Sequence, residues 1–112
     1  MAYDDDLADR IRVCLAAEPG VSERSMFGGL AFLIHGHMAV SVSRQGGLLL
    51  RVEPAQTEQL VGRPHAQRFV MRGREMDGWL RIDPEGIRTT RELNRWVALS
   101  VAYVRSLPPK KA

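Results

Sequence analysis

Apolar residues recur at helical spacing near both ends of the chain. In residues 4–18 the recurring positions are Leu7, Ile11, Cys14 and Leu15. This spacing predicts a first helix that begins in a run of three aspartates and ends before Pro19-Gly20. A longer helix is predicted from residue 89 to about residue 107, because Thr89 and Glu92 have the spacing of a capping box. Its apolar stripe comprises Leu93, Trp96, Val97, Val101, Val104 and Leu107.

Between these two helices the pattern has the period of two that predicts β-strands. The predicted strands are residues 24–34, 38–43, 48–52, 68–72 and 79–83. Pro54 begins a short helix at about residues 54–61, and a polar connection between Gly73 and Gly78 joins the last two strands. The order helix, three strands, helix, two strands, helix predicts an α+β domain. We expect two layers, an antiparallel sheet covered on one face by helices.

The first predicted strand is unusual because an apolar segment, residues 26–34, contains the adjacent glycines Gly28 and Gly29. Glycine weakens the interior of a strand, so such a pair indicates a bulge, a tight bend or a close approach of two backbones. The same segment is apolar on both of its faces. In a two-layer domain we expect it to expose an apolar patch unless something covers it.

Alternation divides the residues of the other strands into two sets. The set expected under the helices is apolar throughout: Met38, Val40, Val42, Leu48, Leu50, Val52, Phe69, Met71, Leu80 and Ile82. The set expected on the uncovered face contains four arginines and a tryptophan: Ala39, Ser41, Ser43, Leu49, Arg51, Arg68, Val70, Arg72, Trp79 and Arg81.

Three interpretations of the uncovered face remain open. In the first, a second copy of the chain covers the apolar strand and the arginines form a polar rim, so the protein is a homodimer. In the second, the face binds nucleic acid, with the arginines on phosphates and the tryptophan stacked on a base. The residues of that interface are Arg51, Arg68, Arg72, Trp79 and Arg81. In the third, the arginines lie over aliphatic neighbours, pair with carboxylates and bind nothing.

Length and composition indicate one soluble domain, residues 1–112, with an ordered core at about residues 4–107 and a short tail. No apolar run approaches the roughly 20 residues that span a bilayer, and the acidic N-terminus lacks the pattern of a secretory signal. We therefore expect a cytoplasmic protein that does not enter a membrane. The net charge is +3 and the cations are almost all arginine, which suits phosphate or carboxylate but also follows from GC-rich codons.

No group of residues in the sequence has the spacing of a catalytic or metal site. His35 and His37 flank a presumed turn without an obvious third ligand, since Cys14 lies in a helix stripe and His65 in a loop. Cys14 on an apolar stripe behaves as a small hydrophobe rather than a nucleophile. The glycine pairs lack the lysine and the strand-to-helix context of a phosphate loop. We expect no enzyme activity, no metal and no cofactor.

Several short motifs in this order resemble the N-terminal domain of the TfoX/Sxy family, bacterial proteins linked to competence for DNA uptake. The motifs are Met26-Phe27-Gly28-Gly29 in a strand, a following hairpin, Arg51-Val52 at the end of a strand, and Gly78-Trp79. They extend over about residues 5–107. Six of these positions are expected to be structural: Met26, Phe27, Gly28, Gly29, Val52 and Gly78.

The resemblance implies an α+β domain without a catalytic motif. Longer family members are similar to transcriptional coactivators of DNA-uptake genes and carry a second, C-terminal domain. In a chain of 112 residues we expect the N-terminal domain alone. The expected function is thus that of a stand-alone regulatory module which acts through protein partners, as a homodimer. Direct nucleic-acid binding is the alternative, and a metal protein or enzyme is a third. Among the motif residues, Arg51 is the one that carries a charge, and packing within the sheet does not explain why a charged residue stands there.

Overall fold

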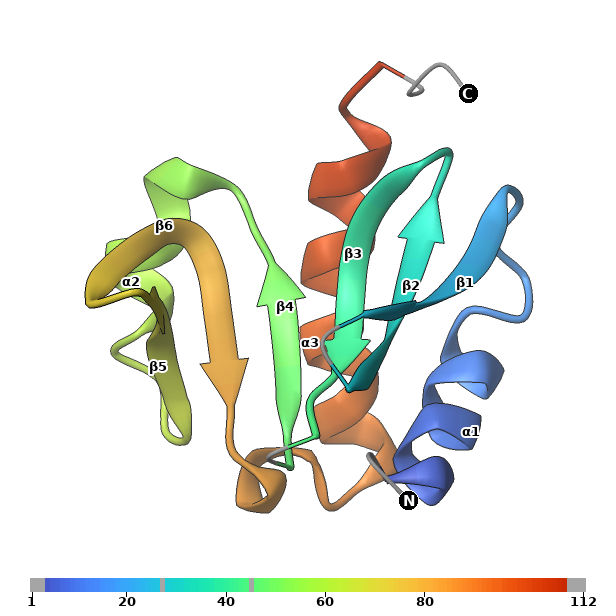
Figure 1. Cartoon of the computed structure of the whole chain (residues 1–112), viewed down its shortest axis with the longest axis horizontal. Helices are drawn as coiled ribbons and strands as arrows, with labels where there is room; N and C mark the ends of the chain where they lie inside the picture. The colour runs from blue at the N-terminus through green and yellow to red at the C-terminus, as the bar shows by residue number, and fades with distance from the viewer. Residues whose placement is uncertain (1–3, 27, 45, 109–112) are drawn as a thin grey trace.

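The computed structural model describes residues 4–26, 28–44 and 46–108. Three α-helices accompany one six-stranded sheet in that part of the chain: α1 (Asp5–Cys14), β1 (Val21–Met26), β2 (Gly29–Ile34), β3 (His37–Val42), β4 (Leu48–Arg51), α2 (Thr57–Leu60), β5 (Ala66–Met71), β6 (Arg74–Ile82) and α3 (Thr90–Arg105). The strand order is β1-β2-β3-β4-β6-β5, and every neighbouring pair is antiparallel. Figure 1 shows α3 alongside the middle of the sheet, α1 near the β1–β2 end and α2 near the β5–β6 end.

The predicted fold class, an α+β domain with an antiparallel sheet and helices in the predicted order, is confirmed. The predicted strand at residues 24–34 is in fact a hairpin of β1 and β2, so four strands precede α2. Both glycines act as expected. Gly28 has the left-handed φ of +77° that the turn needs, and a Cβ on Gly29 would lie 2.3 Å from the carbonyl oxygen of Val42.

The predicted polar connection between Gly73 and Gly78 is wrong. Residues 74–78 belong to the nine-residue strand β6, and the chain turns at Arg72 and Gly73, whose φ angles are +53° and +78°. Two consecutive residues with positive φ give the tight turn that suits a twisted hairpin. The histidine turn was predicted correctly, since His35 and Gly36 have φ angles of +50° and +85° between β2 and β3.

Two irregularities in strand pairing change which side chains lie under the helices. In the β2–β3 pair, Phe32 faces Val40 but Leu33 faces Met38, so Ala39 is an extra residue and Met38 reverses its face. In the β5–β6 pair, Arg68 faces Leu80 but Phe69 faces Met76. Met38, Phe69 and Met71 therefore line a hollow on the face away from the helices, and their predicted place under the helices is wrong.

The hydrophobic core lies between the sheet and the helices. Its largest fully buried side chains come from β2, β4, β6, α1 and α3: Phe32, Ile11, Ile34, Leu48, Leu50, Leu80, Ile82 and Leu93. The capping box predicted for α3 is confirmed, since Thr89 Oγ1 accepts from the Glu92 N–H and the Glu92 carboxylate accepts from the Thr89 N–H.

Strand β2 exposes no apolar patch, although its sequence is apolar on both faces. All six of its residues are buried; Ala31 and Leu33, which alternate with the core residue Phe32, are 0% and 6% exposed, and Phe27 on the same predicted face lies outside the described residues. The strand lies between β1 and β3 in the sheet. The described residues of β2 therefore offer no exposed apolar patch to a second copy of the chain, and the homodimer stays a prediction.

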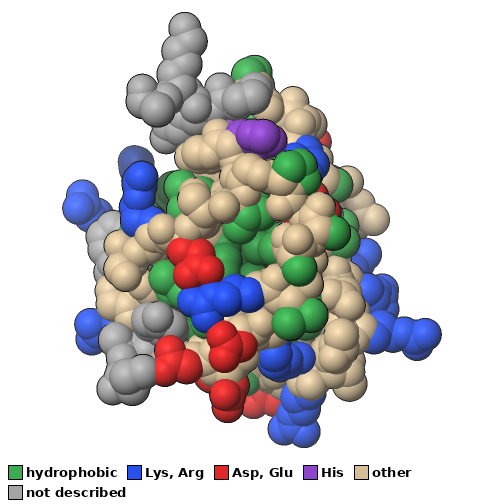
Figure 2. Space-filling view, turned by 90° about the vertical axis from the view of Figure 1, so that its right-hand side faces the viewer, with side chains coloured by type: hydrophobic (Ala, Val, Ile, Leu, Met, Phe, Trp, Pro, Cys, Tyr) green, Lys and Arg blue, Asp and Glu red, His purple; other side chains and the backbone are tan. Residues whose placement is uncertain are grey.

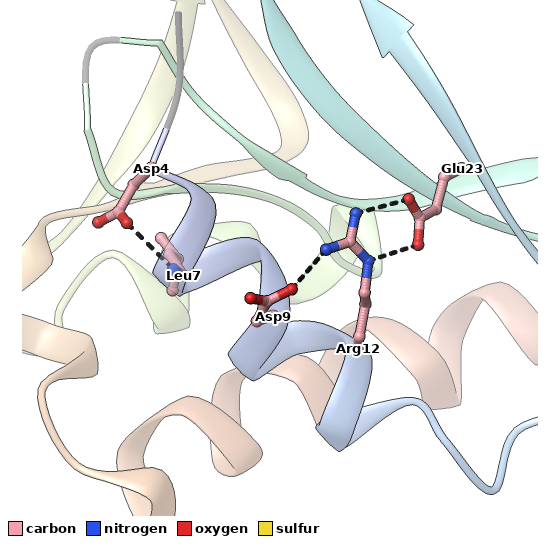
Figure 3. A network of polar contacts seen from close by, with 5 residues as sticks. All are labelled: Asp4, Leu7, Asp9, Arg12 and Glu23. Atoms are coloured by element: carbon pink, nitrogen blue, oxygen red, sulfur yellow. Dashed lines mark hydrogen bonds and ion pairs between the residues drawn. The ribbon is translucent and has the colours of Figure 1, made fainter. Parts of the chain in front are cut away.

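An arginine on α1 holds the edge strand β1 in place. Figure 2 shows hydrophobic side chains in a hollow on this side of the molecule, with basic and acidic side chains meeting across it. Arg12 donates from Nε and Nη2 to the two carboxylate oxygens of Glu23, both at 2.8 Å, and from Nη1 to Asp9 at 2.6 Å (Figure 3). Its guanidinium lies 5.9 Å from the centroid of the Phe32 ring. The contact joins helix, edge strand and core at one point.

The Arg12–Glu23 pair predicts a pH-dependent contribution to stability. The hydrogen bonds from Arg12 hold the pKa of Glu23 below its ordinary value. The contribution is therefore complete above the pKa of the unfolded chain and is lost as the pH falls through the lower, folded-state pKa. We expect Glu23→Gln to be less stable than the parent near neutral pH, and the difference to be smaller at acidic pH, where the parent carboxylate becomes protonated.

Urea unfolding at both pH values, in low and high salt, measures this effect. The difference is expected to be small and to shrink with salt, because both side chains are more than a third exposed. An equal difference at the two pH values would show that the Glu23 charge is not involved. Asp9→Asn tests the other carboxylate on Arg12 and should have the weaker effect, because Asp9 accepts one hydrogen bond and Glu23 accepts two.

Candidate binding groove

The helix-free face of the sheet contains a groove of about 320 Å³ with an apolar lining. Its apolar side chains come from β1, β3, β4 and β5: Met26, Met38, Leu49, Phe69 and Met71. None of these five is fully buried, and Met71 is 43% exposed. Arg44 and Arg81 line the same groove, together with Ser41 and Ser43. We call this surface the sheet groove.

The β1–β2 turn forms one end of the sheet groove. A Cβ on Gly28 would lie 2.7 Å from Cδ of Arg44, so the missing side chain makes room for the aliphatic part of that arginine. Gly29 lies against the backbone of Val42 and, like Met26, lines the groove. The Met-Phe-Gly-Gly motif thus shapes this end of the groove, with Phe27 outside the described residues.

The β5–β6 hairpin forms the other end. Gln67 faces Arg81 across the pair, and the alternate residues Phe69 and Met71 lie on the same side of β5 as Gln67. Arg81 donates from Nη1 to Ser43 Oγ at 3.5 Å, which places its guanidinium near the end of β3. Methionine side chains adapt their shape to a bound surface, so three of them around one hollow suit the binding of an apolar segment.

The five residues predicted for a nucleic-acid or partner face do not form one surface. Arg68 donates to Glu58 on α2 and, at 3.3 Å, to Asp77, so its charge is paired near the helices rather than on the open face. Arg72 lies in the turn between β5 and β6. Of the five, Arg81 alone lines the sheet groove. The predicted grouping of these arginines is therefore corrected, because the true register of β5 turns Arg68 toward the helices.

Arg51 and Trp79 do form a cluster, with a residue of α3. They are register partners in β4 and β6, and the Arg51 guanidinium lies 5.5 Å from the Trp79 ring centroid and 5.7 Å from that of Tyr103. All three side chains are partly exposed. Two aromatic rings near one guanidinium stabilise it by cation–π contact, which gives Arg51 a structural role in joining the sheet to α3.

The remaining motif residues form a buried junction where β4 leaves the sheet. The N–H of Val52 donates to the carbonyl oxygen of Gly78 at 2.8 Å, and the N–H of Gly78 donates to Thr57 Oγ1 at 2.7 Å. Gly78 has a φ of +86°, and a Cβ there would lie 3.2 Å from the ring of Pro54. These contacts agree with the structural role expected for Val52 and Gly78.

The described residues do not bring Cys14 to a catalytic base. Its thiol donates to Asn94 Oδ1 at 2.8 Å between α1 and α3, and burial raises its pKa. A raised pKa favours the protonated thiol, which is the less nucleophilic form of the sulfur. His37 contacts the carbonyl oxygen of Pro108 at 2.6 Å, and among the described residues it does not belong to a group of three metal-ligating side chains. No described helix has the length and apolar character needed to cross a bilayer.

The structure defines an α+β domain with a six-stranded antiparallel sheet and a glycine-containing first hairpin. A comparison against protein families identifies the family to which this domain belongs. The model of the TfoX N-terminal domain matches residues 14–104. The chain belongs to the TfoX N-terminal domain family. Comparison with curated proteins and with solved structures returned no match.

Proposed function

We propose that this domain is a non-enzymatic regulatory module that binds a protein partner through the sheet groove. The observation that carries the proposal is the gathering of five apolar side chains from four strands on the helix-free face. An exposed apolar hollow of this kind is a common feature of protein-binding surfaces. The family is regulatory rather than catalytic, which supports the same function.

The chemistry of the groove favours a partner segment with apolar residues flanked by carboxylates. Met26, Met38 and Met71 provide adaptable contacts, and Arg44 and Arg81 provide positive charge beside them. A second copy of the chain fits less well, because the groove is concave and two identical hollows do not fill each other. The homodimer inferred from the sequence stays a prediction, and light scattering at tens of micromolar tests it directly.

The first test is an amide-resolved NMR titration with three probes. One peptide has an apolar centre and Asp/Glu flanks, a second has the same centre and Lys flanks, and the third probe is a short DNA duplex. We expect the acidic peptide to shift the amides of Met38, Leu49, Phe69 and Met71, and the basic peptide to bind more weakly. Shifts from the duplex alone, lost on raising the salt, would contradict the proposal and support nucleic-acid binding.

Two neighbouring residues of β5 provide a matched pair of variants. Met71 and Val70 are both exposed, at 43% and 54%, but they lie on opposite faces of the strand. We expect Met71→Asp to weaken binding of the acidic peptide by about tenfold or more, because it places a carboxylate in an apolar contact. Val70→Asp should leave the affinity unchanged. Equal losses in both variants would show that the peptide does not occupy the groove.

A further inference from the structure

Three metal-ligating side chains meet at a corner of the molecule that the sheet groove does not use. His65 directly precedes β5 and Asp83 directly follows β6, while Glu85 lies two residues further on, in a 3₁₀ segment. One ligand atom from each of the three lies within 4.8 Å of the other two. We propose that His65, Asp83 and Glu85 bind a divalent first-row transition-metal ion such as Zn²⁺.

Backbone contacts hold the three residues together. Ala66 faces Ile82 in the β5–β6 pair, so the residues just outside that pair are neighbours, and the N–H of Asp83 donates to the carbonyl oxygen of His65 at 2.9 Å. Gly86 lies in the 3₁₀ segment η2 (Pro84–Ile87), and a Cβ there would be 2.8 Å from the Cβ of His65. Glycine therefore allows the loop that carries Glu85 to approach His65 closely.

His65 itself has a backbone conformation that histidine seldom adopts. Its φ is +68°, in the left-handed region, where a side chain costs about 1 kcal/mol or more. The turn before β5 thus imposes this φ on His65, against the intrinsic backbone preference of a residue with a side chain, and so fixes where the imidazole lies. Such strain is common where a side chain is presented to a ligand.

The charges of the cluster favour a cation. Within residues 4–26, 28–44 and 46–108, neither Asp83 nor Glu85 takes part in an ion pair. Asp83 Oδ2 accepts one hydrogen bond, from Gln67 Nε2 at 3.3 Å. Two carboxylates close together repel each other, and a dication between them removes that repulsion. Gln67 then orients the Asp83 carboxylate from outside the coordination sphere.

The donor set indicates the class of metal. An imidazole nitrogen with two carboxylate oxygens suits Zn²⁺ and its first-row neighbours, whereas Mg²⁺ and Ca²⁺ prefer oxygen donors alone. Ligand atoms around tetrahedral Zn²⁺ lie about 3.4 Å apart, a spacing that side-chain rotation at this partly exposed corner can reach. Three protein ligands leave a further position for water or an external donor. His65 also lines a hollow of about 390 Å³ with Arg63 and Trp96.

The test is calorimetric titration of the untagged full chain with ZnCl₂ and separately with MgCl₂. We expect one Zn²⁺ per chain and no heat from Mg²⁺. Glu85→Gln keeps the size of an exposed side chain. His65→Asn introduces asparagine, which tolerates a positive φ as histidine does. Each should weaken Zn²⁺ binding by about tenfold or more, because each removes one of three ligands.

His35→Asn is the matched control. His35 also has a left-handed φ, +50°, and is exposed, so the substitution makes the same chemical change in the same backbone conformation. It should leave Zn²⁺ affinity unchanged, as should Cys14→Ser. The proposal is overturned if Zn²⁺ does not bind, if His65→Asn and Glu85→Gln bind it as tightly as the parent, or if a control variant abolishes binding.

Discussion

Replacing Gly29 with alanine is expected to destabilise the domain by about 3 kcal/mol or more. The new Cβ would lie 2.3 Å from the carbonyl oxygen of Val42, which is backbone and cannot rotate away. The β2–β3 pair would have to separate at the point where Leu30 faces Val42, at the edge of the core. Alanine restricts the unfolded chain slightly more than glycine does, and this gain is smaller than the steric cost.

Thermal unfolding measures the effect, with Gly73→Ala as control. Gly73 has a φ of +78° but nothing within 4 Å of its Cβ position, so its substitution tests the cost of backbone conformation alone, about 1 kcal/mol. Each kcal/mol lowers the midpoint by about 4 °C in a domain of this size. If Gly29→Ala is no less stable than Gly73→Ala, the close approach of the two strands is not required for the fold.

Gly29→Ala also connects stability to the proposed function. Gly29 and Met26 line the end of the sheet groove, so a separation of β2 from β3 changes the shape of that end. We expect the folded fraction of this variant to bind the acidic peptide more weakly than Gly73→Ala does. The family motif thus has two effects through one residue, on folding and on the binding surface.

Local signals in the sequence were sufficient for the starts of the long helices and for most turns, although α1 ends at Cys14, four residues before its predicted end. The capping box of Thr89 and Glu92 involves residues three apart, and Pro54 begins the segment that leads into α2. Gly46 and Gly47 both have positive φ, as expected of a glycine turn. Each of these features is determined by residues that lie within a few positions of one another, so it can be predicted from a short stretch of the sequence.

The register between distant strands was not contained in any local signal. The prediction placed Phe69 and Met71 under the helices because they are apolar, but pairing with β6 puts Arg68 beside Leu80 and turns Phe69 and Met71 to the open face. The extra residue Ala39 reverses Met38 in the same way. A shift of one residue exchanges the two faces of a strand, and the sheet groove was missed for that reason.

The cluster of His65, Asp83 and Glu85 was missed for a related reason. The sequence indicates a histidine in a loop and two carboxylates around a proline turn, separated by a predicted strand pair. They meet because Ala66 faces Ile82, a contact between residues that the sequence does not relate. Even so, His65 and Asp83 lie directly beyond the ends of β5 and β6, and a correct pairing of these strands would have placed those two residues side by side, with Glu85 in the following 3₁₀ segment.

Replacing Thr57 with valine is expected to cost about 2–3 kcal/mol of stability, because it leaves a buried donor unsatisfied. Thr57 is 1% exposed. Its hydroxyl accepts from the N–H of Gly78 at 2.7 Å and donates to the carbonyl oxygen of Pro54 at 2.9 Å. Valine has nearly the same shape, so packing is kept while both hydrogen bonds are lost.

Thr57→Ser separates the hydroxyl from the methyl group. It keeps both hydrogen bonds and should cost about 1 kcal/mol through the loss of one buried methyl. Hydrogen exchange gives an independent result, since the Gly78 amide should exchange faster in Thr57→Val than in Thr57→Ser. Equal stability of the two variants, with unchanged Gly78 exchange, would show that the hydroxyl does not hold the junction. The expected result makes Thr57 a residue that joins the segment after β4 to β6, although none of the family motifs contains it.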